Sequence, residues 1–325
     1  MKDIRINIYT RYDELPTLLE GNIFHSARLF RTMEQTPGLS PCMTVAFNDD
    51  GSVAAQLLTT LRRRGSLLPP YLFTQGRIYG DGLYADERQR EELFARMLQK
   101  TTRYLHRHRC FYIEVSDISK KMFGYRSFSR NGFFPVAWMQ INNSWDEMEP
   151  ELLIDEKMAQ QIKDSHEAGL ETRAANNEQE VHDFYRQLKA YYRFRVQRYI
   201  PSEQLFRNIF HEDAQSIHVT TYKGKIIGGS AIVHDGDKAY LWFSSAKKRT
   251  YSYLRPDVLT IWHTIKASHS AGYKHLYFLN VGLPFERSPY REFLLSFGGK
   301  PVSSYRWFHF TYKWINKLLS AVYSE

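Results

Sequence analysis

Apolar and polar positions in the first half of the chain follow the order hairpin, helix, strand. Residues 43–64 hold two β-rich runs that an Asp-Asp-Gly turn joins, which is the usual punctuation of a hairpin. Residues 86–108 then repeat apolar positions at helical spacing, behind Asp86 as a capping residue. The run "CFYIEVSD" at 110–117 is β-branched and aromatic. The pattern therefore predicts an amphipathic helix between a hairpin and a further strand.

The second half of the chain repeats this order. Residues 216–246 predict a three-stranded meander with Lys-Gly and Asp-Gly turns. Residues 255–272 predict a helix, because Pro256 falls in its first turn and Gly272 at its end. The run "KHLYFLNVG" at 274–282 predicts the strand that follows. Whole supersecondary units recur, which indicates an internal repeat.

A short phrase closes both repeats. It reads "YRSFSRNGFFPV" at 125–136 and "YREFLLSFGGKPV" at 290–302. Each copy predicts a short helix, a glycine and a final strand. We expect the glycine to take a positive φ or to allow a close backbone approach.

Length and the repeat together favour two domains. The chain has 325 residues, of which 43% are hydrophobic, and single cores stop growing at roughly 250–300 residues. We place the boundary near 150, giving domains at 1–150 and 151–325. The second domain includes an acidic, helical connector at 151–190.

Composition narrows the class of protein. Cys42 and Cys110 are the only cysteines, which fits two reduced core thiols better than a disulfide framework or zinc ribbon. The N-terminus lacks an apolar signal region, and no uncharged apolar run reaches about 18 residues, so we expect a soluble, cytoplasmic protein without a transmembrane segment. The formal charge of +9 favours an anionic partner such as phosphate, tRNA or a membrane surface.

Familiar catalytic signatures are missing from the chain. It has no Gly-x-Ser-x-Gly elbow, His-Glu-x-x-His motif, P-loop or Gly-x-Gly-x-x-Gly motif. The twelve histidines form no convincing ligand set, so we expect no metal site. A metal-free enzyme or a binding protein remains.

The repeated unit resembles the GNAT acyltransferases, and the whole chain resembles their FemABX-like branch, which carries two GNAT-like domains in tandem. The resemblance rests on "GRIYGDGLYADERQREELFARML" in the first half and on a long block across the join from "GFFPVAWMQINNSW" to "EVHDFYRQL". In the second half it rests on "GKIIGGSAIV", "YLWFSSA", "LTIWHTIKASHSAGYKHLYF" and "FLLSFGG". It implies an α+β fold of two tandem GNAT-like domains, each a mostly antiparallel mixed sheet flanked by helices.

The resemblance also implies where catalysis would occur. GNAT-type enzymes align an amine with an acyl carbonyl and donate backbone N–H groups to the developing oxyanion. Those donors would lie around Phe243, Ser244 and Ser245, where this strand would splay from the next. Asn280 would position the acceptor. Alternatively, the serines are a solvated strand end and Asn280 a turn residue; a side-chain general base is not assigned.

The acyl donor is harder to identify. A CoA-binding GNAT loop carries glycines before its helix, but "KKRTYSYLRPD" at 247–257 has none. Lys247, Arg249 and Arg255 could bind phosphate by charge or form a solvated basic loop. The matching stretch of the first half has glycines but also Asp81 and Asp86, which favours a degenerate or substrate-binding half.

A basic helix end offers a site for the acceptor. Arg193, Arg195 and Arg198 alternate with aromatic residues near where the family presents an arginine to its anionic precursor. Arginine suits this role because its fork holds phosphate or carboxylate bidentately. The alternative is an exposed basic face of an amphipathic helix.

Taken together, these features predict an acyltransferase that moves an aminoacyl or acyl group to an amine, with a cell-envelope, peptidoglycan-type precursor as the expected acceptor. The co-substrate would be aminoacyl-tRNA or acyl-CoA, with no tightly bound cofactor. The alternatives are a CoA-dependent N-acetyltransferase of a small amine, and a non-catalytic module that binds an anionic ligand or RNA. One departure bears on the donor: the family often reads Phe-Lys-x-x-Phe-Gly where residues 293–298 read "FLLSFG".

Overall fold

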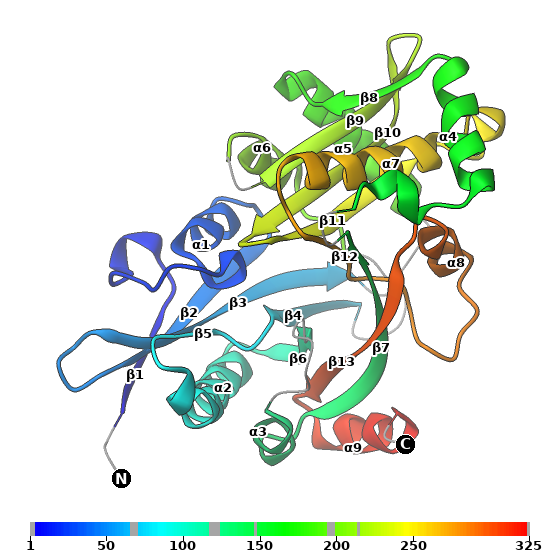
Figure 1. Ribbon diagram of the computed structural model, residues 1–325. Helices are drawn as coiled ribbons and strands as arrows, with labels where there is room; N and C mark the ends of the chain where they lie inside the picture. Colours follow the sequence, from blue (N-terminus) through cyan, green and yellow to red (C-terminus); the bar gives the residue numbers. More distant parts are fainter. Residues whose placement is uncertain are drawn as a thin grey trace. The chain divides into compact units, whose positions relative to one another are not determined.

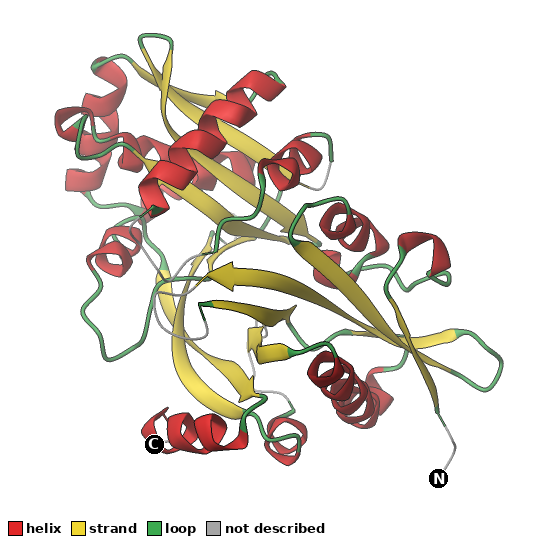
Figure 2. Ribbon diagram, turned by 180° about the vertical axis from the view of Figure 1, so that it is seen from behind, coloured by secondary structure: helices red, strands yellow, loops and turns green. Residues whose placement is uncertain are grey.

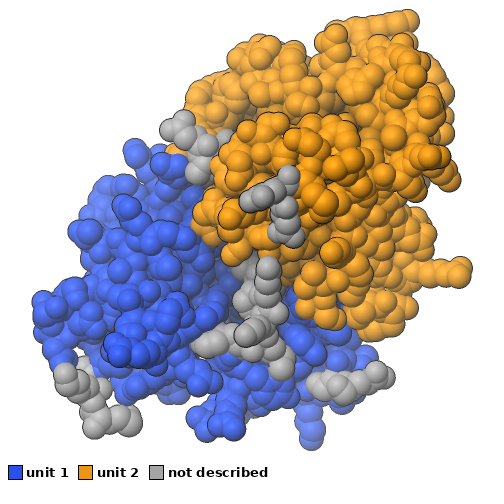
Figure 3. Space-filling model, in the orientation of Figure 1, with its two compact units in different colours: residues 1–138, 304–325 blue, residues 139–303 orange. Residues whose placement is uncertain are grey.

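The chain divides into two compact units. The computed structural model describes residues 4–65, 71–116, 124–145, 148–193, 199–212 and 215–323. Unit 1 comprises Met1–Trp138 and Ser304–Glu325, and unit 2 comprises Met139–Ser303 (Figure 3, blue and orange).

Unit 1 is built on a mixed sheet with strand order β1-β2-β3-β4-β6-β13. Its strands are β1 (Arg5–Tyr9), β2 (Leu39–Phe47), β3 (Val53–Gly65), β4 (Leu72–Tyr79), β6 (Cys110–Ser116) and β13 (Lys300–Phe310), and the short β5 (Leu83–Tyr84) pairs with β3. β4 and β6 are parallel and the other pairs are antiparallel. The helices of unit 1 are α1 (Ala27–Glu34), α2 (Arg90–Arg107), α3 (Tyr125–Arg130) and α9 (Lys313–Tyr323), with 3-10 turns η1 (Tyr12–Glu14), η2 (Ile23–His25) and η3 (Glu87–Gln89).

The predicted amphipathic helix of the first half is α2, the crossover between β4 and β6. A parallel pair needs such a crossover, and α2 lies across one face of the sheet (Figures 1 and 2). Its apolar stripe, which includes Phe94, Met97 and Leu98, is buried. It packs in one core with Ile113 of β6 and Trp307 of β13.

Unit 2 is built on parallel and antiparallel strands in the order β7-β12-β11-β10-β9-β8. Its strands are β7 (Phe134–Ser144), β8 (Leu170–Ala174), β9 (Gln215–Tyr222), β10 (Lys225–Asp235), β11 (Lys238–Ala246) and β12 (His275–Phe278). β11 and β12 are parallel and the other pairs are antiparallel. The helices are α4 (Glu156–Glu167), α5 (Glu178–Tyr192), α6 (Glu203–Phe210), α7 (Pro256–Ser270) and α8 (Pro289–Leu295), with 3-10 turns η4 (Pro150–Leu153) and η5 (Ser252–Leu254).

Helices cover both faces of the unit 2 sheet, and two adjacent glycines of β10 allow their close approach. A Cβ on Gly229 would lie 2.6 Å from the Phe184 ring of α5. A Cβ on Gly228 would meet Thr260 of α7 on the opposite face. Any side chain at either position would therefore push a helix away from the sheet.

The predicted helical connector is an integral part of unit 2. Residues 151–190 hold α4 and most of α5, but a strand, β8, stands between them. β8 pairs with β9 from Leu170 opposite Tyr222 to Ala174 opposite His218. The sequence "LETRA" is too short and too charged for its alternation to reveal this edge strand.

The strands that close the two repeats each run from one unit into the other. β7 begins in unit 1 and ends in unit 2, where Ile141 pairs with Phe278 of β12. β13 begins in unit 2 and ends in unit 1, where Trp307 pairs with Val115 of β6. The compact units therefore differ from the domains at 1–150 and 151–325, since a strand's own alternation does not say which sheet it joins.

The glycine before each closing strand has the predicted geometry. Gly132 has φ 75° and Gly298 has φ 79°, both in the left-handed region. A Cβ on Gly298 would also meet the backbone of Leu153.

Candidate active site

The parallel strands of unit 2 separate part of the way along β11. β11 and β12 pair from Lys238 opposite His275 to Leu241 opposite Phe278, and β11 then continues to Ala246 paired with β10. A β-bulge marks the point of separation. Ala231 of β10 pairs with Phe243, whereas the next residue, Ile232, pairs with Leu241, so Trp242 is the extra residue. A bulge bends its strand, which explains why β11 turns from β12 here.

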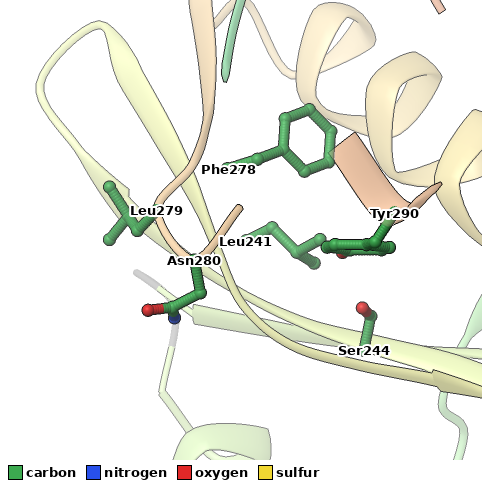
Figure 4. A pocket seen from close by; sticks show the side chains of 6 residues that line it. All are labelled: Leu241, Ser244, Phe278, Leu279, Asn280 and Tyr290. Carbon is green, nitrogen blue, oxygen red and sulfur yellow. The ribbon is translucent and has the colours of Figure 1, made fainter. Parts of the chain in front are cut away.

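A small pocket lies where the strands separate (Figure 4). It is lined by Leu241 and Ser244 of β11, by Phe278, Leu279 and Asn280 at and after the end of β12, and by Tyr290 of α8. The Ser244 hydroxyl is directed towards the Tyr290 ring (Figure 4). The pocket thus has a hydroxyl, an amide and a phenol among its lining groups, beside the part of β11 that is not paired with β12.

The structure brings only some of the predicted residues together at this pocket. Ser244 and Asn280 line it. Side chains alternate along a strand, so Phe243 and Ser245 point to the opposite face. Phe243 is buried against Phe206 of α6, with ring centroids 5.2 Å apart. These two residues can therefore contribute only their backbone groups.

Ser245 is not a solvated strand end, which was the alternative interpretation. It is 4% exposed, and its hydroxyl has no hydrogen-bond partner among the described residues. A buried, unpaired hydroxyl costs free energy.

Tyr290 was missed as a site residue, although it begins the second copy of the closing phrase. Pro289 is the first residue of α8, and the Ser288 side chain accepts a hydrogen bond from Arg291 N, which fixes the first turn that carries Tyr290. The usable signal was an aromatic hydroxyl in the first turn of a capped helix that follows the site strand.

The end of α5 reaches the same strand. The Tyr192 hydroxyl donates to the backbone carbonyl of Ser244 at 3.4 Å. Farther along the helix, Gln187 Nε2 donates to the Ile227 carbonyl of β10 at 2.9 Å, which ties α5 to the sheet. Arg193 follows α5 directly and is exposed. Arg195 and Arg198 lie outside the described residues.

The start of α7 is not built as a phosphate cradle. Arg255 precedes it with φ 48°, and Pro256 supplies no N–H. Asp257 lies in the first turn, where the helix dipole favours negative charge, and its carboxylate is 3.7 Å from Lys248 Nζ. An internal carboxylate thus takes the place that a pyrophosphate would need.

The predicted basic loop before α7 is exposed and separate from the pocket. Lys247, Arg249 and Arg255 are exposed and are not among the residues that line it. In the described ranges, no group of three or more His, Cys, Asp or Glu side chains could hold a metal ion.

In unit 1 the corresponding strands stay paired over the described residues, which stop at Ser116 and resume at residue 124. β4 and β6 pair from Thr74 opposite Cys110 to Tyr79 opposite Ser116. Gly80 N then donates to the Ser116 carbonyl at 2.8 Å.

Before α2, the aspartates that follow β4 already have hydrogen-bond partners within unit 1. Asp81 accepts from Arg90 Nε at 2.7 Å, and Asp86 accepts from Arg88 N at the start of η3. The two aspartates that argued against a phosphate site here are therefore held within the unit.

A buried ionic network crosses the unit 1 strands. Glu114 of β6 pairs with Arg77 of β4 and, at 2.9 Å, with Arg306 of β13. Gln75 Nε2 donates to the same carboxylate at 2.6 Å. Burial alone would raise the pKa of Glu114, but the two guanidinium charges outweigh it and hold the pKa at about 2. Ion pairs thus link β4, β6 and β13 of unit 1, whereas β11 and β12 of unit 2 separate.

Comparison with known proteins identifies the fold. Residues 156–287 match the family model of the acetyltransferase (GNAT) domain. The chain has the FemX-like tandem GNAT fold. The predicted resemblance and fold class are confirmed at this level.

Several solved structures share this fold over most of their length. FemX superimposes with a TM-score of 0.64 at 10% identity, covering 92% of this chain and 95% of that one. L-PGS from Bacillus licheniformis has a TM-score of 0.58 at 10% identity and covers 94% and 93%. A tandem GNAT protein from the clavulanic acid biosynthesis pathway has a TM-score of 0.55 at 10% identity and covers 88% and 87%. No curated protein matches the sequence significantly.

Proposed function

We propose that unit 2 transfers an acyl group to an amine in the opening between β11 and β12. The observation that carries the proposal is the separation of these strands at the Trp242 bulge. Beyond Leu241, β11 is not paired with β12, and it lies beside a pocket lined by Ser244, Asn280 and Tyr290. We assign backbone N–H groups of this part of β11 as the donors. Preorganised N–H donors of this kind stabilise the oxyanion of acyl transfer.

The proposed acyl transfer is a direct attack of the amine on the acyl donor, without a metal or a covalent enzyme intermediate. The acceptor nitrogen attacks the carbonyl carbon of the acyl donor, and the carbonyl oxygen takes up negative charge beside β11. As the tetrahedral intermediate collapses, the bond between carbon and the leaving oxygen or sulfur breaks. We assign Tyr290 to protonate that leaving atom, while Asn280 and Ser244 orient the amine, which gives up its proton to solvent.

We further propose that the donor is an aminoacyl ester, as on aminoacyl-tRNA, and the acceptor a cell-envelope precursor. The filled helix start at Asp257 disfavours a CoA pyrophosphate, whereas the charge of +9 favours an RNA donor. Arg193, beside the site strand, would hold an anionic group of the acceptor. The resemblance to FemABX-like proteins and the fold shared with a lysylphosphatidylglycerol synthetase support this choice. The reaction would take place in the cytoplasm.

A second candidate is CoA-dependent acetylation of a small amine. It is favoured by the acetyltransferase family model over residues 156–287. Under this alternative, Lys247 and Arg249 would bind the phosphates by charge alone.

The test is a product assay by mass spectrometry with four combinations of donor and acceptor. Acetyl-CoA and aminoacyl-tRNA are each incubated with a UDP-linked muropeptide and with a small polyamine. We expect an aminoacyl product on the muropeptide, and none with Ser244→Phe, which fills the pocket. Product from acetyl-CoA alone would establish the second candidate. If no combination yields product although one of the ligands raises the melting temperature, the chain is a binding module.

A further inference from the structure

The C-terminal helix α9 lies beside α3 in unit 1 (Figure 1). Several of its apolar side chains form a stripe that is exposed to solvent. Trp314, Leu318 and Val322 are spaced four residues apart and are 69%, 58% and 63% exposed. Residues at this spacing share one side of a helix. No residue of α9 is buried, so its apolar side chains do not serve a core.

The orientation of α9 is fixed by Asn316 on its other side. Asn316 Oδ1 accepts from Phe310 N at 2.9 Å, and Nδ2 donates to the Gly132 carbonyl at 2.9 Å. Asn316 is two residues from both Trp314 and Leu318, or about 200° around the helix from each. The contacts that hold α9 on unit 1 therefore direct the stripe outward.

The apolar surface continues beyond α9 over the adjacent end of the sheet. Tyr312 is 56% exposed, and its ring lies 5.9 Å from that of Phe111. Phe111 in turn lies 5.5 Å from Phe73 at the start of β4. We call this surface the C-terminal apolar face: Trp314, Leu318, Val322 and Tyr312.

Positive charge borders the C-terminal apolar face. Lys313 and Lys317 are exposed on α9 beside the stripe. Arg107 and Arg109 are exposed where α2 ends and β6 begins, next to Phe111. Residues 300–323 contain no Asp or Glu. An apolar stripe with a tryptophan, bordered by lysine and arginine, is the surface chemistry of interfacial helices.

We propose that the C-terminal apolar face docks on an anionic lipid membrane. The stripe would enter the boundary between headgroups and acyl chains, with Trp314 at headgroup depth and the Lys313 and Lys317 amines reaching lipid phosphates. In the described part of the chain, no helix is long and apolar enough to cross a bilayer, so the attachment is peripheral.

The charges argue against other occupants of the face. A second copy paired about a twofold axis would bring like-charged lysines together. Single-stranded RNA would use aromatic stacking, for which the aliphatic residues Leu318 and Val322 offer nothing. This proposal does not depend on the proposed catalytic role of unit 2.

Vesicle flotation with the full chain tests the proposal. The wild type should float with vesicles that contain phosphatidylglycerol, at least about tenfold more than with phosphatidylcholine alone, and less as ionic strength rises. Trp314→Ser with Leu318→Ser should abolish flotation. The matched control is Phe285→Ser, an equally exposed apolar residue of unit 2. Lys313→Glu with Lys317→Glu should weaken binding to anionic vesicles, unlike Lys157→Glu with Lys163→Glu on α4.

The proposal is overturned if the wild type does not float, or if it floats equally well with Ser at both stripe positions. It is also overturned if light scattering shows a dimer that the stripe variant dissociates, since the face would then bind a second copy. Unchanged circular dichroism and melting temperature establish that each variant is folded.

Discussion

Two pairs of parallel strands, β4 with β6 and β11 with β12, occupy the same place in the repeat but have different ends. In unit 1 the pair stays hydrogen-bonded to Tyr79 and Ser116, and the Glu114 network crosses it. In unit 2 the pair stops at Leu241 and Phe278, and a bulge turns β11 away.

The difference shows how one supersecondary unit can serve two purposes. Buried charge pairs cost desolvation, but they fix which groups lie next to each other. Where two strands separate, the hydrogen bonds between them are lost, and backbone N–H groups at that edge can donate to a ligand. Under the proposed function, unit 1 is accordingly a structural half and unit 2 the half that would carry out acyl transfer.

The largest expected effect is on the stability of unit 1. Glu114→Gln leaves Arg77 and Arg306 buried without their shared carboxylate and should lower the free energy of unfolding by about 3–5 kcal/mol. Urea unfolding measures the change. Glu92→Gln on α2, whose ion pair with Arg96 is exposed, should cost less than about 1 kcal/mol. A loss below that limit for Glu114→Gln would mean that the network does not lock the strands.

The next effect is on catalysis in unit 2. Ser244→Phe should lower kcat/KM at least about 100-fold, or roughly 2.7 kcal/mol, because the ring fills the pocket. The same substitution at Ser303, an exposed residue of β13 in unit 2, should leave activity unchanged. Steady-state kinetics with the working donor and acceptor decides the matter, and normal activity in Ser244→Phe would move the site elsewhere.

A smaller loss is expected from removing one hydroxyl. Tyr290→Phe should reduce kcat about tenfold or more by taking away a hydrogen bond to a charged leaving atom. If Tyr290 supplies the proton, the pH–rate profile should also lose its alkaline limb. Tyr253→Phe removes a hydroxyl from an exposed tyrosine of unit 2 and serves as the control. An unaltered pH profile would leave Tyr290 as a positioning residue.

The smallest effect concerns the response of unit 2 to acid. Burial, with the charges of His263 and His234, lowers the pKa of His218 to about 3. Since its unfolded pKa is near 6.5, the stability that the neutral ring contributes is complete above that pH and is lost as pH falls towards 3. His218→Gln should make the loss shallower by roughly 1 kcal/mol per pH unit.

The control for this prediction is His211→Gln, which alters an exposed histidine. Urea unfolding between neutral and mildly acid pH provides the slopes. Equal slopes in the wild type and His218→Gln would show that His218 does not take up a proton on unfolding.

Periodicity predicted the elements of both repeats because each carries a strong local signal. The stripe of α2, the meander of unit 2 and the positive φ of Gly298 all follow from residues close together in sequence. The course of β7 and β13 from one unit into the other could not be predicted in this way. Alternating apolar and polar residues indicate a strand, but they do not indicate which strand it pairs with. The edge strand β8 was missed for its brevity.

Some of the residues that line the pocket could be predicted from the sequence. The resemblance indicated Ser244 and Asn280, which the pocket brings together. The face on which Phe243 lies depends on the Trp242 bulge, and no local pattern reveals a bulge. Tyr290 lines the pocket because of where α8 lies. The position of α8 depends on packing between residues far apart in sequence.

Hydrogen–deuterium exchange tests the contrast between the two units most directly. The protein is compared with and without the donor that supports turnover, following peptides over 242–246 and 75–79. We predict faster exchange for β11 beyond Leu241 than for β4 in the free protein, and protection of β11 alone when the donor is added. Protection of β4 by the donor, with β11 unchanged, would contradict the assignment of acyl transfer to unit 2.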